Sequence, residues 1–222
     1  MFKPSSFSRA MTQLSLALFT TVALAAGSLQ PAAAASHEAK ENSRMLEGKH
    51  IAFLVGEGVH DGETFMPMAY LVNRGAKVTI IGVKPGTVSA YNSDFEVRVE
   101  KSVTDVQVDQ FHAMVIPGGK SPAFLREHDE VLKFVTAFFE ANKPVAAICH
   151  GPQVLIRADL LDGFRATGVS GISDELKDAG VQYLDEPVVR DRNLITSRVP
   201  DDLPMFSRAI EQSLVAAGAT PD

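Results

Sequence analysis

The fold is decided by the stretch Pro144-Val-Ala-Ala-Ile-Cys-His-Gly-Pro-Gln153, in which a short apolar run ends abruptly at a cysteine. Such a run, unbroken by polar residues, is typical of a strand buried on both faces of a parallel sheet. A helical segment, Gly151 to Ala158, follows at once, so we expect Cys149 at a strand-to-helix turn. The amides that begin a helix there can stabilise a thiolate and a nearby oxyanion. The stretch therefore predicts an α/β fold with a nucleophilic Cys149, and an inert core cysteine is the alternative.

Similar apolar runs recur at Ile51 to Val55, Val78 to Ile81 and Ala113 to Ile116. Between the runs lie segments with helical period, the clearest at residues 131–139, and a last helix is expected after Pro200. Residues 87–103 and 188–197 alternate around turn signals and are predicted to form antiparallel additions. The order predicts one α/β domain with a doubly wound, mostly parallel sheet, helices on both faces and a ligand crevice at the carboxyl ends of the strands.

The first 35 residues have the pattern of a secretory signal peptide. Lys3 and Arg9 precede an apolar stretch from about Leu14 to Ala26, and the small residues Ala32 to Ala35 lead up to Ser36. A membrane anchor is the alternative, but two threonines interrupt the apolar stretch and a proline follows it. We therefore predict a signal peptide at 1–35, a flexible tether at 36–48 and the domain at 49–217. The mature protein is expected to be periplasmic in a Gram-negative bacterium and otherwise secreted, without a stable membrane anchor.

The net charge and the cysteine content limit which classes of partner and which chemistry are expected. The formal net charge of the 222 residues is −6, and no run of Lys or Arg follows the leader, so neither nucleic acid nor an anionic membrane is expected as a partner. Cys149 is the one cysteine of the chain, so it cannot form an intramolecular disulfide. A free thiol in an exported protein favours a chemical role for that residue.

Two other loops at predicted strand ends carry candidate groups. In Ile116-Pro-Gly-Gly119, the glycine amides can face a developing negative charge, although a tight turn alone is the commoner meaning of such a pair.

The loop Gly56-Glu-Gly-Val-His-Asp-Gly-Glu63 lacks the spacing of the dinucleotide fingerprint, so no nicotinamide cofactor is expected. His60, Asp61 and Glu63 offer acid, base or metal-ligand chemistry, but a solvated loop that caps the next helix is more common, and we predict no metal site.

Three segments together resemble the PfpI family: Ile116-Pro-Gly-Gly-Lys-Ser-Pro122, Ala147-Ile-Cys-His-Gly-Pro-Gln-Val-Leu155 and Ile195-Thr-Ser-Arg-Val-Pro-Asp-Asp-Leu-Pro204. The resemblance implies a flavodoxin-like fold akin to class I glutamine amidotransferases. It also implies assembly into dimers or hexamers. By motif match, Cys149 corresponds to the family nucleophile and His150 to its neighbour, while the amides of Gly119 and His150 correspond to an oxyanion hole. Family members are described as intracellular cysteine peptidases or amidases, protein deglycases and glyoxalases.

Two departures from the family pattern concern carboxylates. The family usually has Phe-Glu-Asp after the first strand, with its glutamate on the cysteine sulfur, and this chain has Val59-His60-Asp61. The resemblance therefore places His60 beside Cys149, where a protonated imidazole would favour the thiolate. Glu57 or Glu63 is the rival for that contact. The second family acid, which completes a triad across a subunit contact, is replaced here by Ala123.

Two functions follow as expectations. In the first, the protein is an exported hydrolase or lyase whose Cys149 attacks a reactive carbonyl, its adduct on a protein, or an amide bond. His60 or His150 then moves the proton, with Glu57 or Glu63 as possible acid or base. In the second, it is a stress protein without catalysis that uses Cys149 as an oxidation sensor or binding site. The partners expected are a small carbonyl compound or a protein substrate, with no cofactor.

Overall fold

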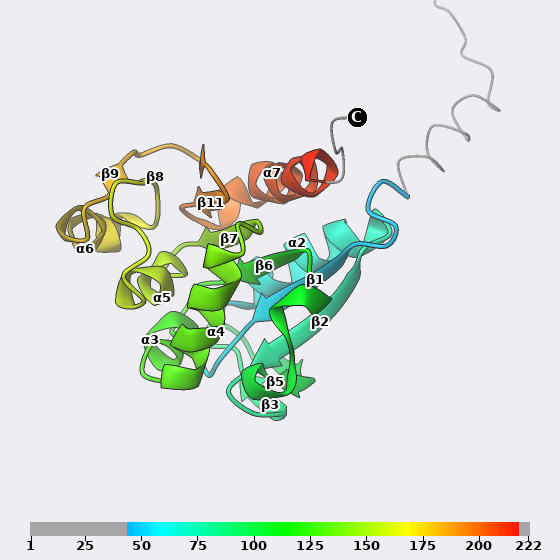
Figure 1. The fold of residues 1–222 in the computed structure, drawn as a ribbon. Helices are drawn as coiled ribbons and strands as arrows, with labels where there is room; N and C mark the ends of the chain where they lie inside the picture. Colours follow the sequence, from blue (N-terminus) through cyan, green and yellow to red (C-terminus); the bar gives the residue numbers. More distant parts are fainter. Residues whose placement is uncertain (1–43, 218–222) are drawn as a thin grey trace, which may run out of the picture.

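A seven-stranded sheet forms the centre of the computed structural model, which describes residues 44–217 (Figure 1). Its strands are β1 (His50–Leu54), β2 (Lys77–Gly82), β5 (Lys101–Ser102), β6 (Ala113–Ile116), β7 (Val145–Ile148), β10 (Val188–Asp191) and β11 (Leu194–Ser197). They lie in the order β10-β11-β7-β6-β1-β2-β5, and every neighbouring pair is parallel except β10 with β11. The predicted doubly wound, mostly parallel sheet is confirmed.

Helices cover both faces of this sheet, as Figure 1 shows. One face carries α2 (Asp61–Asn73) and α7 (Leu203–Ala216), and the other carries α3 (Ser121–Leu125), α4 (Asp129–Glu140) and α5 (Pro152–Arg157). The short helix α6 (Ser173–Asp178) lies with strands β8 (Arg165–Ala166) and β9 (Gln182–Tyr183). Short 3-10 turns are η1 (Val103–Asp105), η2 (Val108–Gln110), η3 (Ser170–Ile172) and η4 (Pro200–Asp202). Within residues 44–217, no helix combines the length and apolar character needed to cross a membrane.

The apolar runs of the sequence become strands because both of their faces are buried. Along β1, Ile51 and Phe53 pack toward α2 and α7, whereas Ala52 and Leu54 pack toward α4 and α5. All four side chains are fully buried. A strand that lacks a solvent face has no position for a polar side chain, which explains the unbroken apolar pattern.

The antiparallel additions also occur where the sequence predicts them. Strands β3 (Gly86–Ser89) and β4 (Glu96–Val99) form a separate two-stranded sheet, and β10 and β11 flank a turn whose Arg192 has a positive φ. The last helix begins at Leu203, directly after η4. Asp202 does not cap it with its side chain; its carboxylate instead accepts from Arg198 Nε at 3.0 Å, in a local ion pair.

The predicted tether is wrong at its last residues. Leu46 has no exposed surface, and its N–H donates to the carbonyl of Arg74 at 2.8 Å. Burying a leucine side chain contributes roughly 2 kcal/mol, which is enough to fix a short segment against the core. The folded unit therefore begins before residue 49. The predicted signal peptide at 1–35 and residues 36–43 of the predicted tether lie outside the described residues.

Two loops at the carboxyl edge of the sheet are joined by backbone hydrogen bonds. The N–H of Lys120 donates to the carbonyl of Gly58 at 2.7 Å, and the N–H of His60 donates to that of Gly118 at 3.3 Å. The loop after β1 is thereby fixed against the loop after β6. As a result, the first turn of α2 lies against the end of β6, next to the end of β7.

Candidate active site

Cys149 lies at the predicted strand-to-helix turn, in a backbone conformation that is rare for a residue with a side chain. Its φ is +61°, in the left-handed region. Its N–H donates to the carbonyl of Ser197 at 3.0 Å, and its carbonyl accepts from Val169 at 3.1 Å. A Cβ at Gly151 would lie 2.4 Å from the carbonyl oxygen of Ile116, so the tight turn requires glycine there. Bonds on both sides of the residue therefore hold the cysteine in this strained conformation.

The sulfur of Cys149 is faced by the two amides that the resemblance assigns to an oxyanion hole. The backbone N–H groups of Gly119 and His150 both hydrogen-bond the sulfur. The imidazole of His150 lies beside it, with Nδ1 3.3 Å from Sγ. Adjacent residues normally point apart, and the positive φ of Cys149 allows these two side chains to meet. Only 9% of Cys149 is exposed.

Glu63 supplies a carboxyl group at the sulfur. The residue has no exposed surface, its Oε2 accepts from the N–H of Gly118 at 2.8 Å, and its side chain hydrogen-bonds Cys149. The other oxygen, Oε1, is buried and has no nitrogen or oxygen partner among the described residues. A buried carboxyl group with so few donors is costly to ionise.

Burial perturbs both partners of this pair in the same direction. It raises the pKa of Glu63 from 4.5 to about 7, although the Gly118 N–H and Cys149 oppose the shift. Burial also raises the pKa of the Cys149 thiol, to about 12, and the negative charge of Glu63 acts in the same direction. The amides of Gly119 and His150 favour the thiolate. The pair therefore holds two protons in mild acid and one above about pH 7, where the remaining proton lies mainly on the sulfur.

The expectation that His60 takes the place of the family carboxylate at the sulfur is wrong. His60 is the N-cap of α2, where its Nδ1 accepts from the N–H of Glu63 at 3.4 Å. Its ring lies edge-on to Tyr91, 5.7 Å between centroids, and 3.5 Å from the carboxylate of Asp61. Burial lowers its pKa, so the ring is neutral at neutral pH and cannot act as the histidinium that the sequence suggested. Among the described residues, Glu63 is the one whose carboxyl group contacts Cys149.

The other candidate carboxylate, Glu57, is not at the sulfur, because its oxygens accept from the N–H of Ser89 on β3 at 3.4 Å. The sequence spacing around Glu63 already indicates that its side chain is buried. It precedes Pro67 by four residues and Leu71 by eight, and all three lie on the buried face of α2. A glutamate on the apolar stripe of a helix is unusual and indicates a specific role. The family carboxylate is therefore present, three positions after His60.

A second carboxylate, missed in the sequence, lies near His150. Glu175, in the first turn of α6, accepts from Arg126 Nη1 at 2.8 Å and from Gln153 Nε2 at 2.6 Å. Burial lowers the pKa of His150, and the charge of Glu175 opposes that shift. Ala123, where the resemblance expects an acid, lies on α3 and offers no polar group.

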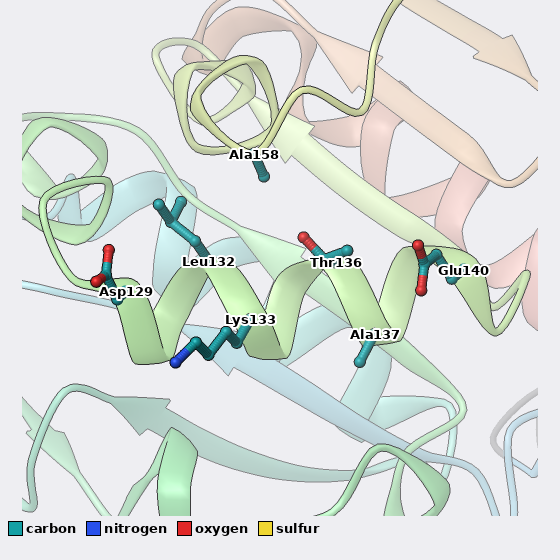
Figure 2. A pocket seen from close by; sticks show the side chains of 7 residues that line it. All are labelled: Asp129, Leu132, Lys133, Thr136, Ala137, Glu140 and Ala158. Carbon is teal, nitrogen blue, oxygen red and sulfur yellow. The ribbon is translucent and has the colours of Figure 1, made fainter.

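One surface groove lies apart from Cys149, His150 and Glu63. Figure 2 shows it along α4, with Leu132 and Thr136 directed toward Ala158 and the charged side chains of Asp129 and Glu140 near its ends. Within the part of the chain that the structure describes, no group of three or more His, Cys, Asp or Glu side chains is placed to hold a metal ion. The candidate chemistry is therefore concentrated at Cys149.

Comparison with known proteins agrees with this geometry. The DJ-1/PfpI family matches residues 49–213. The chain is 42% identical over 160 residues to "Putative cysteine protease YraA" of Bacillus subtilis, covering 72% of this chain and 95% of that protein. It is 40% identical over 162 residues to "Protein/nucleic acid deglycase 2" of Escherichia coli, covering 72% and 94%.

Among solved structures, a two-domain protein of Anabaena variabilis with DJ-1/ThiJ/PfpI-like and ferritin-like domains superposes with a TM-score of 0.74 at 40% identity. The match covers 78% of this chain and half of that longer protein.

The fold is a flavodoxin-like α/β domain with a cysteine at a strained strand-to-helix turn. Two amides face the sulfur of this cysteine, and a buried glutamate lies beside it. These features together define a class of cysteine-centred proteins. The chain belongs to the DJ-1/PfpI family. The resemblance drawn from the sequence is thereby confirmed.

Proposed function

We propose that this protein is a cysteine-dependent enzyme that acts on reactive carbonyl compounds or their adducts on proteins. The observation that carries the proposal is the set of groups around one sulfur: two amide donors, a histidine nitrogen at 3.3 Å and a carboxyl group whose pKa is about 7. A pKa near the working pH is optimal for a group that both takes and returns a proton. Relatives named as deglycases support the same chemistry.

With methylglyoxal as the substrate, the sulfur attacks the aldehyde carbon. The S–C bond forms, the π pair of the carbonyl moves to oxygen, and the thiol proton passes to Glu63. The new alkoxide faces the amides of Gly119 and His150, which stabilise it. A base then takes the hydrogen of this carbon as a proton, while Glu63 gives its proton to the oxygen of the neighbouring carbonyl, which forms an enediol. The base returns its proton to the neighbouring carbon as the alkoxide becomes the thioester carbonyl. The resulting thioester is hydrolysed by water to lactate, which regenerates the thiol.

Carbonyl chemistry suits this site better than peptide hydrolysis. An aldehyde carbon accepts a thiol without expelling a leaving group, whereas an amide requires an acid that protonates the departing amine. His150 has a lowered pKa and is a weak candidate for that acid, and Ala123 removes the family carboxylate from α3. A role as an oxidation sensor is also less favoured, because the sulfur is largely buried and the pKa of its thiol is raised.

The test compares substrates on the wild-type protein under reducing conditions. We expect methylglyoxal to disappear and lactate to form, with little release from a fluorogenic peptide. Because Cys149 is the only cysteine, protein treated with iodoacetamide is a suitable blank and should form no lactate. Peptide cleavage faster than lactate formation would replace the proposal with the peptidase alternative. Equal lactate formation by the treated protein would overturn it.

Location and assembly form a second part of the proposal, supported by the leader-like pattern before Ser36 and by the family resemblance. We propose that the protein is exported, to the periplasm if the cell is Gram-negative, and that it forms a homodimer or hexamer. Amino-terminal sequencing of the abundant cellular form is expected to begin near Ser36, and retention of Met1 would contradict export. Light scattering that reports only a monomer at micromolar concentration would contradict assembly.

A further inference from the structure

The carboxylate of Glu175 is fixed at the helix that begins next to His150. Arg126, at the end of α3, donates to its Oε1 at 2.8 Å, and Gln153, in the first turn of α5, donates to its Oε2 at 2.6 Å. The N–H of Gln153 in turn donates to the carbonyl of His150 at 3.0 Å. Three helices therefore meet at this carboxylate, and its position relative to His150 does not depend on a flexible loop.

His150 needs a partner for its second ring nitrogen. Its Nδ1 lies 3.3 Å from the sulfur of Cys149. For Nδ1 to accept the proton of the thiol, the neutral ring must carry its own proton on Nε2. The hydrogen bond made by the far nitrogen decides which tautomer is present. Without an acceptor for Nε2–H, the ring can equally adopt the tautomer that has no lone pair facing the sulfur.

Glu175 has the capacity to be that acceptor. An ionised carboxylate can accept about four hydrogen bonds, and Arg126 and Gln153 use two of them. Among the described residues, Glu175 is also the charged group that acts on the pKa of His150, which it raises against the effect of burial. Ala123 provides no competing acceptor.

We propose that Glu175 is the positioning residue of His150: it accepts a hydrogen bond from Nε2–H, directly or through one water, and so keeps the lone pair of Nδ1 facing the sulfur as a second proton acceptor besides Glu63. The inference rests on the proposed cysteine chemistry. It adds that the cysteine, the histidine and an orienting acid all come from one chain. The site then requires no carboxylate from a neighbouring subunit in place of Ala123.

The test follows the ring of His150 by NMR in the full-length reduced protein, with the signal assigned by its loss in His150→Gln. In Glu175→Gln, the pKa of His150 should fall, because the charge that favours the imidazolium is removed. Lactate formation from methylglyoxal should fall by about ten-fold or more, as expected when an orienting acid is lost. Glu175→Asp should recover part of both effects. Asp174→Asn, a neutralisation of the exposed neighbouring residue on α6, should change neither.

An unchanged pKa of His150 in Glu175→Gln would overturn the inference. If wild-type protein forms no lactate, the NMR titration still decides the role of Glu175, so that failure of the proposed function is seen separately. If Glu175→Gln does not fold, long-range proton–nitrogen NMR of the wild type gives the tautomer directly. A proton on Nε2 is the result expected, and a proton on Nδ1 of the neutral ring would overturn the inference.

Discussion

Replacing Glu63 with glutamine is expected to lower turnover while making the folded protein more stable at neutral and alkaline pH. The amide oxygen of glutamine can still accept from the N–H of Gly118, so the local packing is kept. The variant keeps Nδ1 of His150 beside the sulfur, but it lacks the carboxyl group that exchanges a proton with Cys149 near neutral pH. Loss of a general acid–base group costs roughly 10²- to 10⁴-fold in rate. Lactate formation measured at several methylglyoxal concentrations checks this result.

The stability effect follows from the raised pKa. The folded protein binds the Glu63 proton with a pKa of about 7, compared with 4.5 for the reference group. The contribution to stability is fully present below pH 4.5 and is lost as pH rises through about 7. A difference of about 2.5 units corresponds to about 3 kcal/mol, because one unit is worth about 1.4 kcal/mol. Glu63→Gln should lack this loss.

Denaturant unfolding across this pH range measures the stability effect. Glu57→Gln is the matched control, because it neutralises a glutamate of the loop just before α2 whose carboxylate accepts from β3 and does not contact the sulfur. A wild type and a Glu63→Gln variant with the same dependence of unfolding free energy on pH would contradict the assigned burial of Glu63. So would a stability gain of equal size in Glu57→Gln.

Replacing Gly118 with alanine is expected to reduce turnover by about a hundred-fold, because the site has no room for a methyl group. A Cβ at this position would lie 2.7 Å from Cβ of Cys149, 2.7 Å from Oε2 of Glu63 and 3.0 Å from the N of His150. Groups around the sulfur must then shift to make room. A displacement of about 1 Å at reacting groups can cost on the order of 10²-fold in rate. Overpacking should also lower the unfolding free energy by about 1–3 kcal/mol.

Gly171→Ala is the control for this substitution. Nothing lies within 4 Å of a Cβ built at Gly171, and the residue is exposed on η3. Lactate formation and thermal unfolding of this variant should match the wild type. Gly118→Ala protein with wild-type turnover would show that the groups around the sulfur are not held as the structure places them.

The fold can be predicted from the sequence because most of its strands are buried on both faces, which leaves unbroken apolar runs. Runs such as 113–116 and 145–148 coincide with β6 and β7, and the helical period at 131–139 lies within α4. The end of the tether does not follow from the sequence pattern, because one buried leucine, Leu46, fixes its last residues against the core. A single apolar side chain in a polar segment gives no periodic signal.

The site can be predicted from the sequence only in part, for a different reason. The position of Cys149 follows from strand and helix patterns that are local in sequence. The choice between His60 and Glu63 depends on which residue of the first turn of α2 faces inward, and the hydrogen bond from Gly118 that fixes Glu63 spans 55 residues. The link between Glu175 and the start of α5 likewise joins segments that the sequence does not show to be neighbours.

The ionisation of Cys149 is coupled to Glu63 and not to His60 in this site. The pH dependence of Cys149 alkylation by iodoacetamide, followed by intact mass, tests it most directly in wild type, Glu63→Gln and His60→Ala. Above pH 7, Glu63→Gln should react faster than the wild type, because the negative charge that raises the pKa of the thiol is gone. His60→Ala should follow the wild-type profile. A profile that changes in His60→Ala and stays the same in Glu63→Gln would contradict the coupling of Cys149 to Glu63.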